Sequence, residues 1–359
     1  MINYVQHIAI GVRDIDASYK FYRDILGFRV VFFDARNVMV PDLSIESYSR
    51  DKKHQCEIRM FFALHPMGGA GLEFAQFRHV EPVPPVKDVT LGDIGYVELA
   101  IRVNRLEEFC SNLQALGINL LTPISEKNWM DGATRKFTYI RDPDGTLIQL
   151  VETPPNGFID KPCTMGIEHL GLGVPDLESA ERFYTDVLEF GQPLFRWDES
   201  AHVPNGFTGD RDLLVRNVLI GNKSDKKGHS GMINQTNLRL IHTNGSAGAN
   251  ISKDRRWGDI GLLEVAVDTS DIDRAIEELE SRTPHSEITR FRIELGIGSY
   301  GYFAFVLDPF GNLVELVDLK KIWFLPSDVV SSAMYPVIHS VDRLKELKWN
   351  WSRFFSVKV

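Results

Sequence analysis

Two histidines open a stretch of sequence that occurs twice, and they are the first side chains that could do chemistry. His7 begins the run His-Ile-Ala-Ile-Gly-Val, and His169 begins the similar run His-Leu-Gly-Leu-Gly-Val. Because successive side chains of a strand point to opposite faces, each histidine shares its face with alanine or glycine. Small neighbours leave room for a ligand, and imidazole nitrogen is a common metal ligand.

Carboxylate and amide side chains occupy equivalent places in other repeated segments. Glu98 and Glu264 lie in matching Gly-Asp-Ile-Gly segments, and Gln149 and Glu315 follow matching Asp-Pro-x-Gly turns. Glu73 alternates with apolar residues in the same way. Burying a carboxylate without compensation is costly, so equivalent polar positions of this kind favour a metal site over incidental polar residues.

These repeats show that the second half of the chain is a copy of the first. The offset is 162 residues between His7 and His169, and 166 residues both between Gly92 and Gly258 and between the two Asp-Pro-x-Gly turns. A nearly constant offset over three separated segments indicates a duplicated domain, with about four residues inserted before Gly258.

Each half also divides into two modules that begin with a strand. Helical periodicity follows the first strand at Ile15–Leu26 and Leu106–Leu116, and alternating strands come after it. We therefore expect modules at 1–80, 92–155, 165–245 and 258–320, grouped into domains at 1–155 and 165–320. Residues 321–359 exceed the repeat, and they contain an amphipathic helical pattern at 342–355.

The composition is that of a globular protein and does not suggest a nucleic-acid partner. The chain of 359 residues is 43% hydrophobic and 25% charged, with a formal net charge of −9. Phosphate binding needs clustered Lys and Arg, so an acidic chain argues against it. The three cysteines are widely separated, and we see neither a leader nor an apolar run of the roughly 20 residues that a membrane span needs. We expect a cytoplasmic protein with reduced thiols.

The histidine strand, the helix containing Phe-Tyr and the Asp-Pro-x-Gly turn together resemble the vicinal oxygen chelate superfamily, which includes glyoxalases and extradiol dioxygenases. The resemblance extends to about residue 320. It implies an α+β fold in which four βαβββ modules pair into two cupped eight-stranded sheets, with the two modules of each half forming one cup. The first and last strands of each module would then present four side chains to a divalent metal.

Under that resemblance, each half contributes one set of four residues. The first half offers His7, Glu73, Glu98 and Gln149, a set that suits Zn²⁺, Mn²⁺, Fe²⁺, Ni²⁺ or Co²⁺. The second half offers His169, Arg239, Glu264 and Glu315. A guanidinium cannot ligate a metal. Either the second cup has lost its metal and its polar residues satisfy Arg239, or Arg239 holds an anionic group beside a weaker, degenerate site.

The first set is similar to that of the glyoxalase and epimerase branch. The resemblance implies a metal-dependent isomerase or epimerase that acts on an α-hydroxy-ketone through an enediolate, with Glu73 as the first choice for the proton base and Glu98 as the second. Architecture, length and ligand pattern are most similar to 2-epi-5-epi-valiolone epimerases, which act on a cyclitol ketone. Superfamily members often associate, which makes a homodimer the expected assembly.

Two other functions remain open within the same fold. A non-haem iron dioxygenase is one, although such enzymes use two His and one Glu, and this chain has Glu98 and Glu264 where the second His would stand. A small-molecule-binding resistance protein without turnover is the other. Oxygen consumption would identify the first, and binding without turnover the second.

Overall fold

The computed structural model describes residues 2–39, 57–78, 80–85, 87–128, 132–154, 161–202, 212–222, 236–244, 248–251, 253, 255–283, 288–296 and 299–321. The helix expected at 342–355 and Cys56 lie outside these residues. Within them, Cys110 and Cys163 are free thiols. No helix in the described part of the chain is long and apolar enough to cross a bilayer.

Four modules with the order strand, helix, three strands make up the described chain. The first comprises β1 (Ile2–Gly11), α1 (Ile15–Asp24), β2 (Val30–Met39), β3 (Glu57–Leu64) and β4 (Gly71–Phe77). The second comprises β5 (Gly95–Asn104), α3 (Leu106–Ala115), β6 (Ser125–Asn128), β7 (Thr134–Arg141) and β8 (Leu147–Glu152). The third comprises β9 (Cys163–Gly173), α4 (Leu177–Arg182) continued by a π-helix (Phe183–Val187), β10 (Gly191–His202), β11 (Asp212–Asn222) and β12 (Asn237–Asn244). The fourth comprises β13 (Gly261–Thr269), α5 (Ile272–Arg282), β14 (Thr289–Gly296), β15 (Ser299–Leu307) and β16 (Leu313–Lys321).

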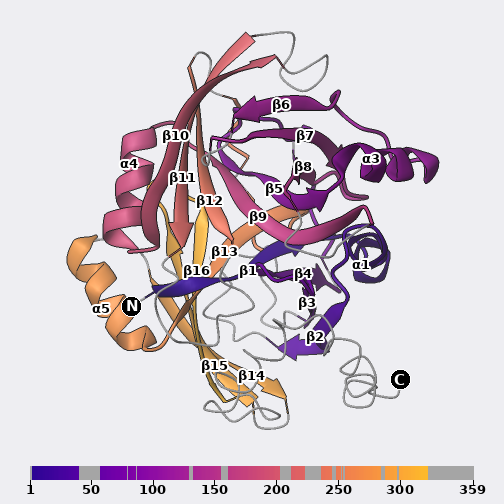
Figure 1. The fold of residues 1–359 in the computed structure, drawn as a ribbon. Coiled ribbons are helices and arrows are strands. Elements are labelled where there is room, and N and C mark those ends of the chain that lie inside the picture. Colours follow the sequence, from indigo (N-terminus) through magenta and orange to yellow (C-terminus); the bar gives the residue numbers. More distant parts are fainter. Residues whose placement is uncertain are drawn as a thin grey trace.

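The modules form two eight-stranded sheets, as the repeat predicts. Sheet A has the order β14-β15-β16-β13-β1-β4-β3-β2, and sheet B has the order β10-β11-β12-β9-β5-β8-β7-β6. Sheet A therefore joins the first module to the fourth, and sheet B joins the second to the third (Figure 1). The expectation that the two modules of each half share a cup is wrong. The outer modules pair with each other, and so do the inner ones.

Close backbone contacts explain the glycine that ends each histidine strand. A Cβ added to Gly11 of β1 would lie 1.9 Å from the carbonyl oxygen of Asp259, and one added to Gly173 of β9 would lie 1.7 Å from that of Asp93. Asp259 and Asp93 belong to the Gly-Asp-Ile-Gly segments that precede β13 and β5. The repeated glycine is therefore required where the paired module crosses the strand.

The two modules of each half remain linked by a buried tyrosine. Tyr22 of α1 donates a 2.9 Å hydrogen bond to Asp142 in the turn before β8. Tyr184 of the π-helix donates a 3.2 Å hydrogen bond to Asp308 in the turn before β16. Because each aspartate also caps its own turn, the Phe-Tyr helix and the Asp-Pro-x-Gly turn act together, although they belong to different sheets.

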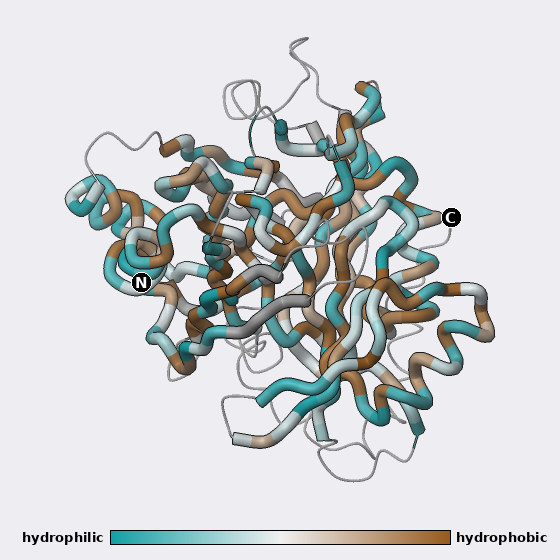
Figure 2. Tube along the Cα trace, turned by 90° about the horizontal axis from the view of Figure 1, so that it is seen from above, coloured by the Kyte–Doolittle hydropathy of each residue, from teal (hydrophilic) through white to brown (hydrophobic). Residues whose placement is uncertain are grey.

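One hydrophobic core contains side chains of both sheets. It includes Ile8 and Ile10 of β1, together with Leu99 and Ile101 of β5. In Figure 1, α4 and α5 lie on one side of the molecule and α1 and α3 on the opposite side. In Figure 2 the helices at the edge of the molecule carry both hydrophilic and hydrophobic residues, as expected for helices that pack one face against a sheet. The polar residues singled out in the sequence lie on the other face of each sheet.

Candidate metal centre

Four polar side chains meet at the centre of sheet A, on its four middle strands β16, β13, β1 and β4. Glu264 of β13 and Glu73 of β4 both lie directly opposite Ala9 of β1. His7 of β1 and Glu315 of β16 both lie opposite one alanine of β13. Residues directly opposite each other in a sheet project from the same face, so the four side chains surround two small residues. We call His7, Glu73, Glu264 and Glu315 site A.

The side chains of site A point toward one another and are buried. His7 Nε2 lies 3.4 Å from Glu315 Oε2 and 3.8 Å from Glu73 Oε2. Single ligand atoms of His7, Glu73 and Glu264 all lie within 4.8 Å of each other. The exposed fraction is 6% for Glu73 and Glu315, 2% for His7 and 1% for Glu264. This spacing is what one cation needs to contact several ligands at once.

Site A brings three carboxyl groups together, and no permanently charged basic side chain is among its four residues. Burial raises the pKa of Glu264 to about 8, despite a hydrogen bond from Trp257. Burial and repulsion from Glu264 raise the pKa of Glu73 well above its ordinary value. Glu315 is affected in the same way, with Glu73 adding to the repulsion. Burial lowers the pKa of His7 to about 3, so the imidazole is neutral. A neutral imidazole is the form that ligates a metal.

Two neighbouring side chains orient the ligands. Gln6 Oε1 lies 2.8 Å from His7 Nδ1. An amide oxygen can only accept, so Nδ1 carries the proton and the lone pair of Nε2 faces the carboxylates. Trp257 donates a 3.1 Å hydrogen bond to Glu264 Oε1. His7 Nε2 and Glu264 Oε2 are buried and make no hydrogen bond with the described residues.

The residues of site A fit a divalent cation. Buried polar atoms without hydrogen bonds are rare, and here they converge with two further carboxylates on one point. One imidazole nitrogen and three carboxylates make a borderline-to-hard donor set, which is compatible with Zn²⁺, Mn²⁺, Fe²⁺, Ni²⁺ or Co²⁺. A bound cation would offset the burial, and for Glu73 and Glu315 also the repulsion, that raise the carboxylate pKa values.

Sheet B has four side chains at the equivalent positions, and we call them site B: Glu98, Gln149, His169 and Arg239. Glu98 and Arg239 lie opposite Gly171 of β9, whereas His169 and Gln149 lie opposite an alanine of β5. A Cβ on Gly171 would lie 2.3 Å from Glu98 Cγ, so glycine leaves the space that the glutamate occupies.

Arg239 is the centre of site B and is completely buried. Its Nη1 donates a 2.8 Å hydrogen bond to Glu98 Oε1, and its Nε and Nη2 donate to Asn217 Oδ1 at 2.9 and 2.8 Å. His169 Nε2 lies 3.1 Å from the same Glu98 oxygen. Burial alone would raise the pKa of Glu98, but Arg239 and His169 outweigh it and lower that pKa to about 2. Gln149 donates to the Tyr139 hydroxyl at 2.5 Å.

The structure therefore splits both of the sets expected from the sequence. His7 and Glu73 are brought together, but Glu98 and Gln149, expected beside them, lie in sheet B. Glu264 and Glu315, expected beside His169 and Arg239, lie in sheet A and complete site A. The physical reason is the exchange of modules between sheets described above. Glu98, the second choice for the base, instead forms an ion pair with Arg239.

Sequence reasoning missed the orienting residues Gln6 and Trp257. Both lie next to segments that it examined, since Gln6 precedes His7 and Trp257 precedes the Gly-Asp-Ile-Gly segment of the fourth module. The sequence did contain a signal for Trp257, because Leu91 stands at the corresponding place before the second module. An indole N–H is a donor that leucine lacks.

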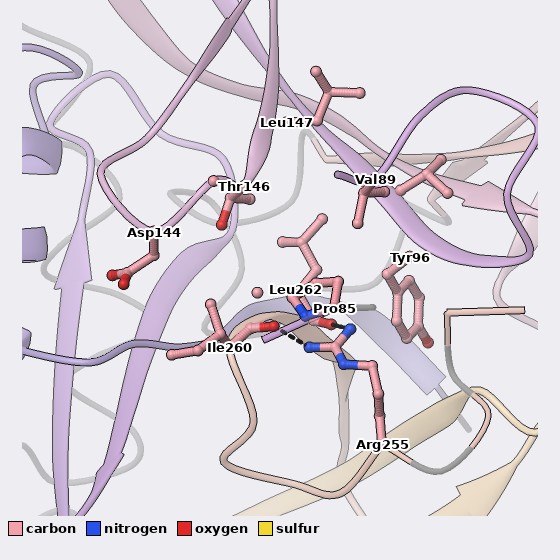
Figure 3. Close-up of a pocket in the computed structure, with 12 residues that line it drawn as sticks. Pro85, Val89, Tyr96, Asp144, Thr146, Leu147, Arg255, Ile260 and Leu262 are labelled. Carbon is pink, nitrogen blue, oxygen red and sulfur yellow. Dashed lines mark hydrogen bonds between the residues drawn. The ribbon is translucent and has the colours of Figure 1, made fainter. Parts of the chain in front are cut away.

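A separate pocket lies between the two sheets but is too small for a substrate. Tyr96, Thr146, Arg255 and Leu262 are among its lining residues, and Figure 3 shows Arg255 donating to the backbone carbonyls of Ile260 and Leu262. Its volume of about 20 Å³ is enough for about one water molecule. No residue of site A or site B lines it.

Comparisons with known proteins agree with this architecture. Lactoylglutathione lyase from Schizosaccharomyces pombe is 24% identical over 334 residues, which cover 88% of this chain and 96% of that protein. The crystal structure of glyoxalase I from Zea mays superposes with a TM-score of 0.57 at 19% identity, covering 88% of this chain and 92% of that one. The model of the Glyoxalase/Bleomycin resistance protein/Dioxygenase superfamily matches residues 4–150 and 166–316. The chain belongs to this superfamily.

Proposed function

We propose that the protein is a divalent-metal-dependent isomerase or epimerase of an α-hydroxy-ketone, and that site A carries the reaction. The observation that supports this most is the cluster of three buried carboxylates and a neutral imidazole, with two of its buried ligand atoms lacking hydrogen bonds. A structural cluster would be expected to contain its own counter-charge, as site B does with Arg239.

A bound cation would polarise the substrate carbonyl, acidify the neighbouring C–H group and stabilise the enediolate. His7 and Glu264 would hold the cation in a fixed position, because Gln6 and Trp257 fix the geometry of their side chains. Glu73 remains our first choice for the group that removes the proton. Glu315 replaces Glu98 as the second choice, since it occupies the equivalent position on the other side of His7.

The two carboxylates lie on the last strands of two different modules, on either side of the histidine. A proton removed by one and returned by the other to the opposite face of the same carbon gives epimerisation. A proton returned to the neighbouring carbon gives isomerisation. Both carboxylates retain a few per cent of exposure, whereas Glu264 retains almost none. This difference supports Glu73 and Glu315 as the residues that contact the substrate.

The similarity to lactoylglutathione lyase supports this reaction class, because a lactoyl group carries a hydroxyl next to its carbonyl. Within the class, the cyclitol 2-epi-5-epi-valiolone is the substrate expected from the sequence, and it is one of the compounds to be tested. Three carboxylates and one histidine in site A argue against the iron dioxygenase alternative, whose usual set is two histidines and one carboxylate.

Proton exchange with solvent tests the proposal directly. The metal-loaded enzyme is incubated with an α-hydroxy-ketone in D₂O, and deuterium at the carbon that carries the hydroxyl is measured by NMR while dissolved oxygen is monitored. We expect deuterium incorporation without oxygen consumption, and a loss of about 10²-fold or more in Glu73→Gln. Glu98→Gln is the matched control: it leaves Arg239 without its counter-ion and should lower stability, but the folded protein should retain exchange. Oxygen consumption coupled to substrate loss would identify a dioxygenase instead.

A further inference from the structure

Aromatic side chains flank both proposed bases of site A. Phe62 of β3 lies directly opposite Glu73, and Phe305 of β15 lies directly opposite Glu315. Opposite residues share a face, so each carboxylate has a phenyl ring beside it on the same face of the sheet. The Phe62 ring also meets the His7 imidazole edge to face, with centroids 5.6 Å apart.

Each flanking ring belongs to a larger aromatic group. On the side of Glu73, Phe33 stacks on Phe62 with centroids 5.5 Å apart. On the side of Glu315, Phe291 stacks on Phe303 at 5.8 Å and contacts Phe305 at 5.1 Å. The surroundings of the two proposed bases are therefore apolar on both sides, and the rings other than Phe62 belong to or pack against one cluster of buried aromatic and aliphatic residues.

This lining restricts the part of the substrate that does not react. A hydroxyl group placed against phenyl rings loses its hydrogen bonds to water and gains none, which costs free energy. A planar apolar group instead buries its surface against the rings and gains the favourable geometry of aromatic pairs. A polyhydroxylated ring would have to leave several hydroxyls facing hydrocarbon.

We propose that the substrate of site A is an α-hydroxy-ketone with an aryl or similarly flat apolar substituent, which packs against one of the phenylalanine groups that flank the site. This inference rests on the proposed function, because it assumes that the carbonyl and hydroxyl oxygens are bound at site A. It departs from the polyhydroxylated cyclitol expected from the sequence.

A matched pair of chelators tests the lining without turnover. Benzohydroxamate and acetohydroxamate present the same two oxygens to a metal and differ only in phenyl against methyl. Their dissociation constants for the metal-loaded protein are measured by isothermal titration calorimetry. We expect benzohydroxamate to bind at least about 10-fold more tightly, the preference that a hydrophobic pocket typically gives. In Phe303→Leu this ratio should decrease several-fold while the metal content is unchanged.

Phe195→Leu is the control for this variant. Phe195 lies on β10 of sheet B, where it stacks on Trp197 with centroids 5.2 Å apart, so its substitution removes a stacked ring of the same kind away from site A. The hydroxamate ratio should remain that of the wild type. Equal binding of the two hydroxamates to the wild-type protein would overturn the inference and leave the metal site standing. Failure of both to bind would overturn the proposed function as well.

Turnover of three substrates is an independent test of the aryl preference. Phenylacetylcarbinol, acetoin and 2-epi-5-epi-valiolone are compared for deuterium incorporation, in which the C–H proton passes to a glutamate and a solvent deuteron returns to the same carbon. We expect the highest kcat/KM for the phenyl compound. Exchange with acetoin or the cyclitol but not with the phenyl compound would refute the aryl substrate and support the proposed function. Absence of exchange with all three would refute both.

Discussion

Site A and site B occupy the same positions in two sheets of the same topology but balance their charges in different ways. Two equivalent residues are retained, since His7 matches His169 and Glu264 matches Glu98. Two have changed, since Arg239 stands where site A has Glu73, and Gln149 stands where it has Glu315. Site B thus contains one carboxylate and a permanent cation, and site A contains three carboxylates and none.

The comparison indicates that carboxylates buried at either site ionise only with positive charge beside them. In site B the guanidinium supplies it, and it is held by Glu98, by Asn217 and by the Trp197 ring, whose centroid is 5.3 Å away. In site A the carboxyl groups either stay protonated, as their raised pKa values imply, or ionise around a cation from outside the chain. Of the two alternatives left open by the sequence, that the polar residues satisfy Arg239 or that Arg239 holds an anionic group, these contacts favour the first.

The largest expected difference between the sites is in metal content. His7→Ala should remove bound metal and reduce activity by about 10³-fold or more, because the imidazole and its correctly oriented lone pair are lost. His169→Ala should retain the metal of the wild type, because its partner Glu98 is already bound to Arg239. Elemental analysis of the purified proteins checks both. Loss of metal only in His169→Ala would reverse the assignment of the two sites.

Replacing the two residues of site B that differ from site A, Arg239 and Gln149, by glutamate should give site B the same ligand types as site A. Arg239→Glu combined with Gln149→Glu restores a histidine and three glutamates, so the metal content should rise from one to two ions per chain. Arg239→Gln is the control, since it removes the cation without adding a ligand. If the double variant folds and still binds a single ion, the ligand types alone do not explain the difference between the sites.

Most of this arrangement can be predicted from the sequence, but one step cannot. The repeats locate all eight residues of sites A and B, and alternation places them on one face. Which four meet depends on whether β1 pairs beside β5 or β13, and both of these strands begin with similar sequences and are apolar on their other face. Strand periodicity carries no information about the partner module, so the pairing has to come from long-range packing such as that of Gly11 against Asp259.

The ion pair of site B should also contribute to the free energy of unfolding. Arg239→Leu leaves Glu98 buried without its partner and should lower the free energy of unfolding by about 3–5 kcal/mol. Adding Glu98→Leu removes the unpaired charge, so the double variant should recover most of the loss. Urea denaturation measures both. Arg274→Leu, on the exposed face of α5, is the control and should cost about 1 kcal/mol or less.

The smallest expected effect concerns the residues that orient the ligands of site A. Gln6→Leu removes the acceptor that keeps the Nδ1 proton of His7 in place, so the imidazole can adopt the tautomer whose Nε2 is protonated and cannot ligate. Outer hydrogen bonds of this kind usually contribute about 10–100-fold to metal affinity. The metal dissociation constant, measured by competition with a chelator, should rise within that range.

The same reasoning predicts a separate consequence for Trp257→Phe. Phenylalanine keeps the aromatic contact with Phe77 but has no N–H to hold Glu264 Oε1. Both Glu264 oxygens can then turn toward the cation, and binding should weaken less than in Gln6→Leu because the carboxylate can still ligate. Gln192→Leu, an exposed position on β10, should leave the dissociation constant unchanged. An unchanged constant in all three variants would mean that the ligand geometry is set by the strands alone.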